Sequence, residues 1–144
     1  MKLVVWQILR QSGNPHPSGL SGCRGQIPAA GTEPGVFELR TYKASPGKLD
    51  NLNARFRDHT LALFKKHGMS NVGYWTPLAK EKGAGETLIY ILAHKSKEAA
   101  AASFKAFGAD PEWLAAKKAS EANGSLTVKV ESVFMAPTDY SPMK

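Results

Sequence analysis

After Gly35 the chain shows a regular succession of strand-like and helix-like hydrophobic patterns, and their order admits few folds. Residues 36–42 alternate apolar and polar side chains with period two, which is typical of a strand with two different faces. One face carries Glu38, Arg40 and Tyr42, and the other carries Phe37, Leu39 and Thr41. We expect helices to pack on the apolar face, so that the charged and aromatic face of the sheet has no helical cover.

The remaining elements follow from the same reasoning. Predicted strands cover residues 36–43, 69–76, 86–94 and 126–135. Predicted helices run from the turn at residues 45–47 to His67, over residues 97–107 with an end at Gly108, and from the N-cap Asp110 to Glu121. The order β-α-β-β-α-β predicts an α+β, ferredoxin-like fold, in which helices cover one face of a four-stranded antiparallel sheet.

The N-terminal part of the chain has a different character. Residues 10–35 are rich in Gly, Ser and Pro and show no apolar period. We therefore predict that residues 1–35 form a disordered or processed leader and that a single domain covers residues 36–142. The sequence favours a cytoplasmic location, with export or organelle targeting by residues 1–30 as the alternative.

Charge and composition exclude several classes of protein. Residues 1–32 carry Lys2, Arg10 and Arg24 and no acid, so +3 of the formal net charge of +7 lies in the leader and the domain is only mildly basic. No apolar run reaches the ~20 residues that span a bilayer, so we expect no transmembrane segment. Cys23 is the only cysteine, which excludes an internal disulfide. The sequence has no phosphate-binding loop and no metal-ligand spacing, so we expect neither a cofactor nor a metal.

Two kinds of partner commonly cover an open sheet face of this topology. One is single-stranded RNA, but the strand at residues 87–94 lacks the glycine pair, the basic start and the paired aromatic residues of RNA-binding sheets. We therefore expect no nucleic acid. The other partner is a second copy of the same domain, which would close two sheets into a barrel-like homodimer with an interior cavity.

An ordered set of motifs resembles the NIPSNAP family over residues 36–142, but not over the leader. The motifs are Phe37-Glu38-Leu39-Arg40-Thr41-Tyr42, Pro46-Gly47-Lys48, Phe56-Arg57-Asp58-His59-Thr60, Lys66-His67-Gly68, Val72-Gly73-Tyr74-Trp75-Thr76-Pro77, Asp110-Pro111-Glu112-Trp113 and Pro137-Thr138-Asp139-Tyr140-Ser141-Pro142. The resemblance implies a dimeric ferredoxin-like α/β barrel, and the family has no general, established catalytic activity. It also implies protein binding as a role of some members, while relatives in the wider barrel superfamily include cofactor-free oxygenases and isomerases.

Arg40 is the central candidate on the face that is expected to line the cavity. Its charge needs a partner in an enclosed space, either Glu38 on the same strand or Glu131 on the last strand. The alternative is that Arg40 holds a carboxylate or an enolate-like ligand. Tyr42 shares this face and adds an aromatic side chain to the cavity wall.

His59 falls between Phe56 and Leu63 on the predicted apolar seam of the first helix. A histidine at such a position is expected to be buried and to hydrogen-bond within the protein. The alternative is a general base or a ligand at the edge of the cavity.

Side chains of the neighbouring strands extend the predicted cavity. Tyr90 and His94 share one face of the third strand and are expected to join Arg40. Tyr74 and Trp75 are adjacent in the second strand, so one of them must face the cavity and the other the helices. Trp113 is expected to clamp the last helix onto the rest of the domain.

Together these residues predict a function without naming a reaction. The candidate ligand-binding residues are Arg40, Tyr42, His59, Tyr74, Trp75, Tyr90 and His94, and the candidate catalytic residues are His59, Arg40 and His94. We expect a homodimeric small-molecule-binding or protein-interaction module, and the sequence leaves open whether the protein is an enzyme. The alternative is a cofactor-free monooxygenase or isomerase that acts on a small aromatic or enolisable substrate in the barrel cavity. In that case Arg40 would stabilise negative charge and His59 or His94 would move a proton.

Overall fold

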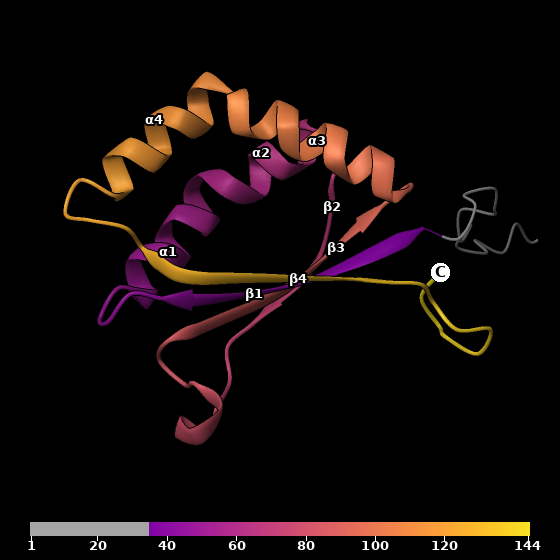
Figure 1. Ribbon diagram of the computed structural model, residues 1–144, viewed down its shortest axis with the longest axis horizontal. Coiled ribbons are helices and arrows are strands. Elements are labelled where there is room, and N and C mark those ends of the chain that lie inside the picture. Colours follow the sequence, from indigo (N-terminus) through magenta and orange to yellow (C-terminus); the bar gives the residue numbers. More distant parts are fainter. Residues whose placement is uncertain (1–34) are drawn as a thin grey trace, which may run out of the picture. The chain divides into compact units, whose positions relative to one another are not determined.

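The computed structural model describes residues 35–144, which form a four-stranded antiparallel sheet with helices on one of its faces (Figure 1). The strands are β1 (Val36–Ala44), β2 (Ser70–Trp75), β3 (Thr87–His94) and β4 (Thr127–Met135), in the spatial order β2-β3-β1-β4. The predicted α+β, ferredoxin-like fold is confirmed. The predicted leader, residues 1–35, lies outside the described residues except for Gly35.

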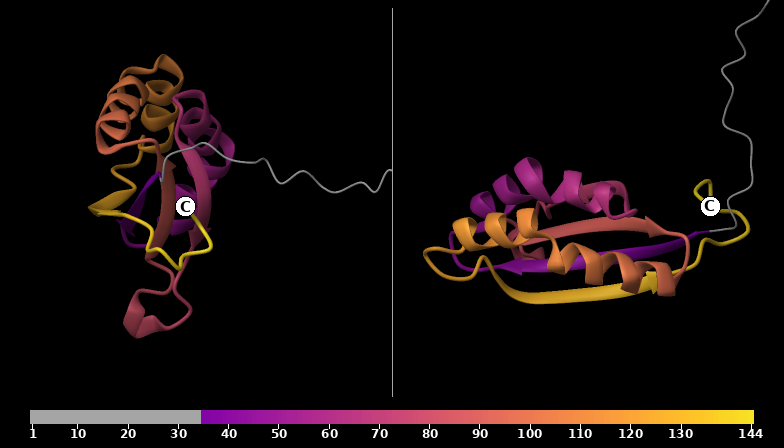
Figure 2. Two further views of the ribbon diagram at one scale, coloured as in Figure 1. Left: turned by 90° about the vertical axis from the view of Figure 1, so that its right-hand side faces the viewer. Right: turned by 90° about the horizontal axis from the view of Figure 1, so that it is seen from above.

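The helices form one layer over the sheet. They are α1 (Leu49–Arg55), α2 (Leu61–Lys66), α3 (Lys97–Ala109) and α4 (Pro111–Ser120). A π-helical turn, η1 (Phe56–Thr60), joins α1 to α2, and a short 3-10 turn, η2 (Lys80–Lys82), lies between β2 and β3. Seen from above, the four α-helices lie over the same face of the sheet (Figure 2). Within residues 35–144, no helix has both the length and the apolar character that a membrane crossing requires.

Local sequence explains where α3 and α4 begin. The Ser96 side chain accepts a hydrogen bond from the backbone N–H of Ala99 at 3.0 Å, and Asp110 caps α4 ahead of Pro111. The predicted break at Gly108 is wrong, because α3 continues to its last residue before Asp110. The helix stops at Asp110 because a residue that precedes proline is driven towards extended backbone.

The first helix differs from its prediction in one turn. The backbone N–H of Leu61 donates to the carbonyl oxygen of Phe56, five residues back, so η1 holds one residue more than a regular turn. Thr60 is buried at this turn and His59 is exposed. The prediction that His59 lies on the apolar seam is therefore wrong, because the seam was calculated for a regular helical period.

Strand pairing identifies the side of the sheet that the helices cover. Arg40 lies opposite Tyr90 on β3 and opposite Ser132 on β4, so these side chains share a face. That face is the helix-covered one, because Tyr90 is fully buried in a core cluster with residues of the helices. The predicted grouping of side chains is confirmed, but its assignment to the two faces is reversed, since Glu38, Arg40 and Tyr42 face the helices.

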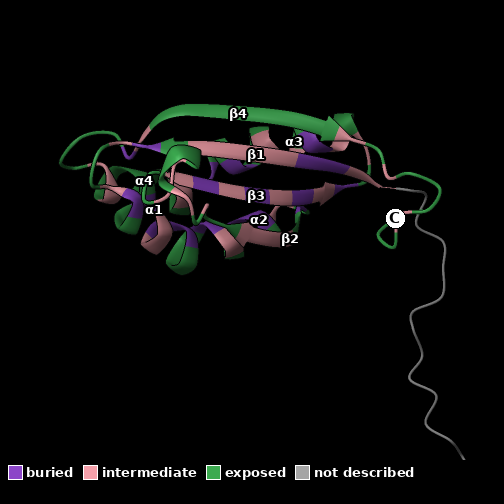
Figure 3. Cartoon of the chain, turned by 90° about the horizontal axis from the view of Figure 1, so that it is seen from below, coloured by how far each residue is buried: buried purple, intermediate pink, exposed green. Residues whose placement is uncertain are grey.

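The opposite face of the sheet, called the bare face below, carries no helix and is turned towards the viewer in Figure 3. Strand pairing places on it Phe37, Leu39, Thr41 and Lys43 of β1, Gly73 and Trp75 of β2, Ile89, Ile91 and Ala93 of β3, and Lys129, Glu131, Val133 and Met135 of β4. Its middle is aliphatic, and Trp75 and Val133 are about half exposed, at 51% and 55%. Both faces of the sheet are therefore largely apolar, so alternation along β1 does not reveal which face the helices cover.

Aromatic rings fill the space between the sheet and the helices. Phe56 contacts Tyr42, Phe64, Tyr74 and Tyr90 edge to face, with ring centroids 5.2–6.2 Å apart. Such pairs add directional attraction to the free energy gained by burying apolar area. Phe56 therefore links the π turn to three strands of the sheet.

We predict that Leu52→Ala destabilises the fold strongly. The Leu52 side chain is fully buried in the core under α1, so its truncation leaves a cavity and should lower the free energy of unfolding by about 2–5 kcal/mol. Urea unfolding followed by circular dichroism measures the change. Leu114→Ala is the matched control on α4, where half of the side chain is exposed, and it should cost about 1 kcal/mol or less. Equal losses in the two variants would contradict this account of the core.

Candidate functional site

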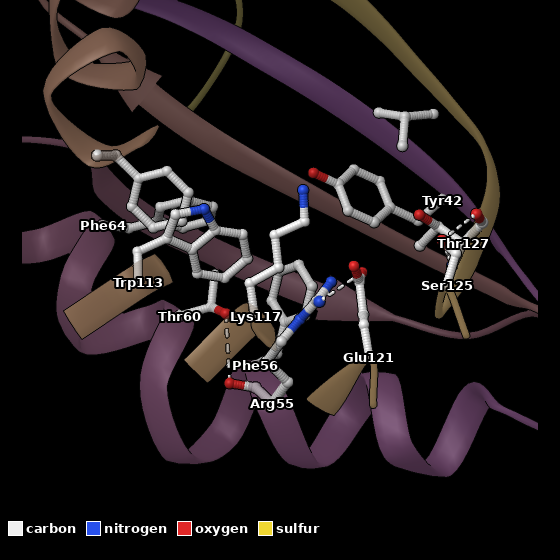
Figure 4. Close-up of a pocket in the computed structure, with 12 residues that line it drawn as sticks. Tyr42, Arg55, Phe56, Thr60, Phe64, Trp113, Lys117, Glu121, Ser125 and Thr127 are labelled. Atoms are coloured by element: carbon white, nitrogen blue, oxygen red, sulfur yellow. Dashed lines mark hydrogen bonds and ion pairs between the residues drawn. The ribbon is translucent and has the colours of Figure 1, made fainter. Parts of the chain in front are cut away.

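A cavity of about 200 Å³ lies between the helices and the strands β1 and β4, on the helix-covered side of the sheet (Figure 4). We call it the helix–sheet pocket. It is lined by Tyr42, Arg55, Phe56, Thr60, Phe64, Phe107, Trp113, Lys117, Glu121, Ser125, Thr127 and Val130. The lining thus comes from the first helix, from α3 and α4, from the strands β1 and β4 and from the loop before β4.

One wall of the pocket is aromatic. Phe64, Phe107 and Trp113 contact one another in sequence with tilted rings, whose centroids are 4.9 Å apart in the first pair and 4.4 Å apart in the second. Tyr42 and Phe56 meet at 5.8 Å and continue this wall towards the sheet. A concave surface of several rings suits a flat apolar molecule.

The opposite wall is charged and centres on Arg55. The Arg55 side chain is only 5% exposed, and its Nη1 atom pairs with Glu121 Oε1 at 2.9 Å and with Ser120 Oγ at 3.3 Å. Its guanidinium carbon lies 5.0 Å from the centre of the Trp113 ring, a cation–π contact. Its Nε atom is buried and has no hydrogen-bond partner within the described residues.

The π turn places three successive features of this pocket. Arg55 ends α1, Phe56 begins η1 and Thr60 ends it. The Thr60 hydroxyl donates to the backbone carbonyl oxygen of Arg55 at 3.3 Å, which turns this side chain towards the cavity. Wider turns of this kind occur often at functional sites, because they move side chains off the regular helical surface.

A second polar cluster lies under the helices but outside the lining of this pocket. Glu38 is 2% exposed and receives Arg40 Nη1 at 2.7 Å, Ser132 Oγ at 2.5 Å and His94 Nε2 at 2.9 Å. The Arg40 guanidinium also lies over Phe104, 4.5 Å from the ring centre. The cluster therefore joins β1, β3 and β4 through one carboxylate.

The surroundings of Glu38 fix its charge. Burial acts to raise the pKa of Glu38, but the hydrogen bonds from His94 and Ser132 and the charge of Arg40 outweigh it, so its pKa lies below the ordinary 4.5. The expected alternative partner of Arg40, Glu131, is not used. It lies opposite Thr41 on the bare face and pairs with Lys129 at 2.6 Å.

The structure separates the residues that the sequence proposed as one site. Tyr42 lines the helix–sheet pocket, and its hydroxyl oxygen accepts from Arg40 Nη2 at 3.4 Å. The other candidates lie elsewhere: Arg40 and His94 in the Glu38 cluster, Tyr74 and Tyr90 stacked in the core, His59 exposed on the first helix and Trp75 on the bare face. His59 lines two other pockets beside the first helix and α4, of about 270 and 380 Å³, which are more open to solvent than the helix–sheet pocket.

Sequence reasoning missed Arg55, Lys117 and Glu121 as pocket residues. Arg55 follows Leu52 by three positions, so helical spacing alone places it beside the apolar seam. Lys117 and Glu121, in and just after the last turn of α4, give no comparable signal, because charged residues are common at the end of an exposed helix. The predicted packing role of Trp113 agrees with its contacts to Phe107 and Arg55. Among residues 35–144, no three His, Cys, Asp or Glu side chains come together in a group suited to a metal.

We predict that in Glu38→Gln the free energy of unfolding depends less on pH below pH 4.5 than it does in the wild type. Because the folded pKa of Glu38 is lowered, its ionised form stabilises the fold above pH 4.5, and this contribution is lost as the pH falls from 4.5 towards the folded value. Near neutral pH the variant should lose about 1–3 kcal/mol of unfolding free energy, since Arg40 keeps a buried charge without its counter-charge. Urea unfolding at a series of pH values measures both effects.

Glu131→Gln is the control for this experiment. It removes an exposed carboxylate from β4 that pairs with Lys129 and faces away from Glu38, so the wild-type profile should be retained. A Glu38→Gln profile that runs parallel to the wild-type profile below pH 4.5 would contradict the account of the cluster.

Comparisons with known proteins agree with this architecture. The family model NIPSNAP matches residues 37–142. A NIPSNAP family protein with unknown function from Agrobacterium tumefaciens is 24% identical, with a TM-score of 0.65 and coverage of 76% of this chain and 94% of that chain. A second NIPSNAP family protein from the same organism is 21% identical, with a TM-score of 0.66 and coverage of 76% and 99%.

An uncharacterised NIPSNAP domain protein from Burkholderia xenovorans is 24% identical, with a TM-score of 0.62 and coverage of 74% of this chain and 98% of that chain. No curated protein is significantly similar to the chain. The match of the family model spans nearly the whole folded domain, and the motifs at both of its ends fall inside it. The chain therefore belongs to the NIPSNAP family.

Proposed function

We propose that this NIPSNAP-family protein is a homodimeric module that binds a small molecule in the helix–sheet pocket. The observation that carries the proposal is the pocket itself, where an aromatic wall faces a buried arginine whose Nε atom has no partner in the described residues. Ligand pockets in proteins combine such an apolar lining with a few polar groups that fix orientation.

The size of the pocket limits its occupant. Its volume of about 200 Å³ lies below the roughly 300–1,000 Å³ of pockets for drug-sized ligands. An occupant of one or two fused rings matches this volume. The pocket also lies away from the bare face, so the ligand would not sit between two sheets, as the sequence suggested, but inside each subunit.

The bare face supports the homodimer. Its aliphatic middle, formed by Leu39, Ile89 and Ile91, is partly exposed, and contiguous apolar surface of this kind favours a partner. The edge strand β4 is exposed along both of its faces, including Val130 and Val133 (Figure 3). A second copy that covers this face would bury its apolar side chains, and a symmetric pair is the commonest assembly.

The loop between β2 and β3 also supports a dimer contact on the side of the bare face. It carries η2 and projects away from the helical layer (Figures 1 and 2). Leu78, at its start, is 99% exposed. An apolar side chain on an arm beside the bare face is well placed to contact a partner subunit.

The enzyme alternative gains no support from the placement of its residues. Arg40 is paired with Glu38, the His94 side chain is 1% exposed, and neither residue lines the helix–sheet pocket. His59 is exposed on the outer side of the first helix. A proton-moving histidine must reach a substrate atom, and no histidine lines this pocket.

We predict that Ile91→Glu yields a stable monomer. Ile91 lies in the middle of the bare face, where a buried carboxylate in a dimer interface would lack a partner. Analytical ultracentrifugation at micromolar concentration should report twice the chain mass for the wild type and the single chain mass for the variant. Ala115→Glu, an equivalent change on the exposed side of α4, should remain dimeric. A wild-type protein that sediments as one subunit would overturn the homodimer.

We predict that Val130→Trp abolishes retention of a small molecule. Val130 lines the pocket from β4 and is 45% exposed, so an indole at this position can fill the cavity while the fold is kept. Native mass spectrometry of the protein from its own host should show an added mass on the wild type and none on this variant. Val128→Trp changes a neighbouring exposed residue outside the pocket and should retain the added mass. Equal retention by both variants would place the molecule elsewhere.

A further inference from the structure

We propose that the molecule held in the helix–sheet pocket is a small planar aromatic anion whose negative group lies between Arg55 and Lys117. The proposal rests on the proposed function and adds the chemical class of the ligand. It follows from three features of the pocket: its balance of charge, its unpaired donors and the shape of its aromatic wall.

The charge of the pocket lining is positive. Arg55, Lys117 and Glu121 are its only ionisable residues apart from Tyr42, which gives two cations and one anion. Glu121 is already engaged by Arg55 at 2.9 Å. Lys117 makes no ion pair with any described residue, so the positive charge left over in the pocket is the ammonium group of this side chain.

Lys117 is directed across the cavity. It leaves α4 one turn before Glu121, and Figure 4 shows its ammonium end between Trp113 and Tyr42. Lysine side chains on an exposed helix surface usually extend into water. Lys117 is exposed as well, but it also lines the pocket, so its ammonium group is within reach of an anionic group on a bound ring.

Arg55 supplies the second donor. Its side chain is 95% removed from solvent, and its buried Nε–H has no acceptor within residues 35–144. A buried donor without an acceptor costs free energy, and an acceptor oxygen on the ligand would recover it once the guanidinium turns its Nε–H towards the cavity. A cationic ligand would repel both residues, and a neutral hydrocarbon would leave Nε unpaired.

The aromatic wall determines the shape of the rest of the ligand. The rings of Phe107 and Trp113, tilted towards each other with centroids 4.4 Å apart, and the ring of Phe56 line the pocket and favour a flat molecule that lies against them. The volume of about 200 Å³ fits one or two fused rings with a single charged substituent. A carboxylate on a bicyclic ring therefore satisfies both the charge and the shape.

Isothermal titration calorimetry of the full-length protein with 2-naphthoate and 2-naphthamide tests the proposal. The two probes share their shape and differ in charge. We expect 2-naphthoate to bind at least about tenfold more tightly at low salt, because a charge-assisted hydrogen bond exceeds a neutral one by about that factor. The difference should shrink as sodium chloride is raised, because screening weakens the exposed Lys117 contact.

Substitutions at Lys117 assign the effect to this residue. Lys117→Gln should lower the affinity for 2-naphthoate about five- to tenfold and leave that for 2-naphthamide unchanged. Lys117→Arg should keep the preference for the anion. Lys118→Gln removes an equally exposed charge from the next position of α4, outside the pocket, and should change neither affinity.

The outcomes separate the ligand class from the function. If both probes bind equally and Val130→Trp abolishes the binding of both, the ligand is not required to be an anion. The pocket would then remain a binding site. Preference for 2-naphthoate that persists in Lys117→Gln would remove Lys117 from the proposal. If neither probe binds while the host-purified protein retains a molecule in this pocket, the ligand class is wrong. If neither probe binds and nothing is retained, the proposed function fails as well.

Discussion

The carboxylate of Glu38 determines which way the sheet faces. It is buried under the helices, where Arg40, His94 and Ser132 each place a polar hydrogen or a charge against it, so one acidic group ties three strands together. This network lets a charged residue in the middle of β1 lie in the core at acceptable cost. As a result the aliphatic set of the strand, with Leu39 at its centre, is turned to the side that has no helices.

The π turn of the first helix determines which of its side chains line the helix–sheet pocket. In a regular helix His59, three residues after Phe56 and four before Leu63, would lie on the apolar seam. With the extra residue in η1, Thr60 is buried in the pocket wall and His59 is exposed, while Arg55, at the end of the regular helix α1, contacts Trp113 and Glu121. The extra residue thus puts the hydroxyl of Thr60, and not the imidazole of His59, in the lining of the helix–sheet pocket.

The sequence predicted local structure well where a short-range signal exists. The cap Asp110, the element order and the sharing of one face by Arg40 and Tyr90 all follow from spacing and side-chain chemistry. The choice between the two faces did not follow, because both are apolar and the burial of Glu38 depends on Ser132, which lies 94 residues further along the chain. For the same reason Arg55 and Glu121 were not recognised as a pair, since only the folded chain brings α1 and the end of α4 together.

The two tryptophans of the folded domain lie on opposite sides of the sheet. Trp113 forms part of the pocket wall, where it contacts a guanidinium, and Trp75 is half exposed on the bare face. Indole fluorescence depends on the polarity and the charges around the ring, so each side chain is a built-in optical reporter of one surface. With Trp6 also replaced by phenylalanine, a Trp75→Phe protein emits from the pocket and a Trp113→Phe protein emits from the opposite face. Occupancy of the cavity and the proposed contact between subunits can therefore be followed separately, without attaching a dye.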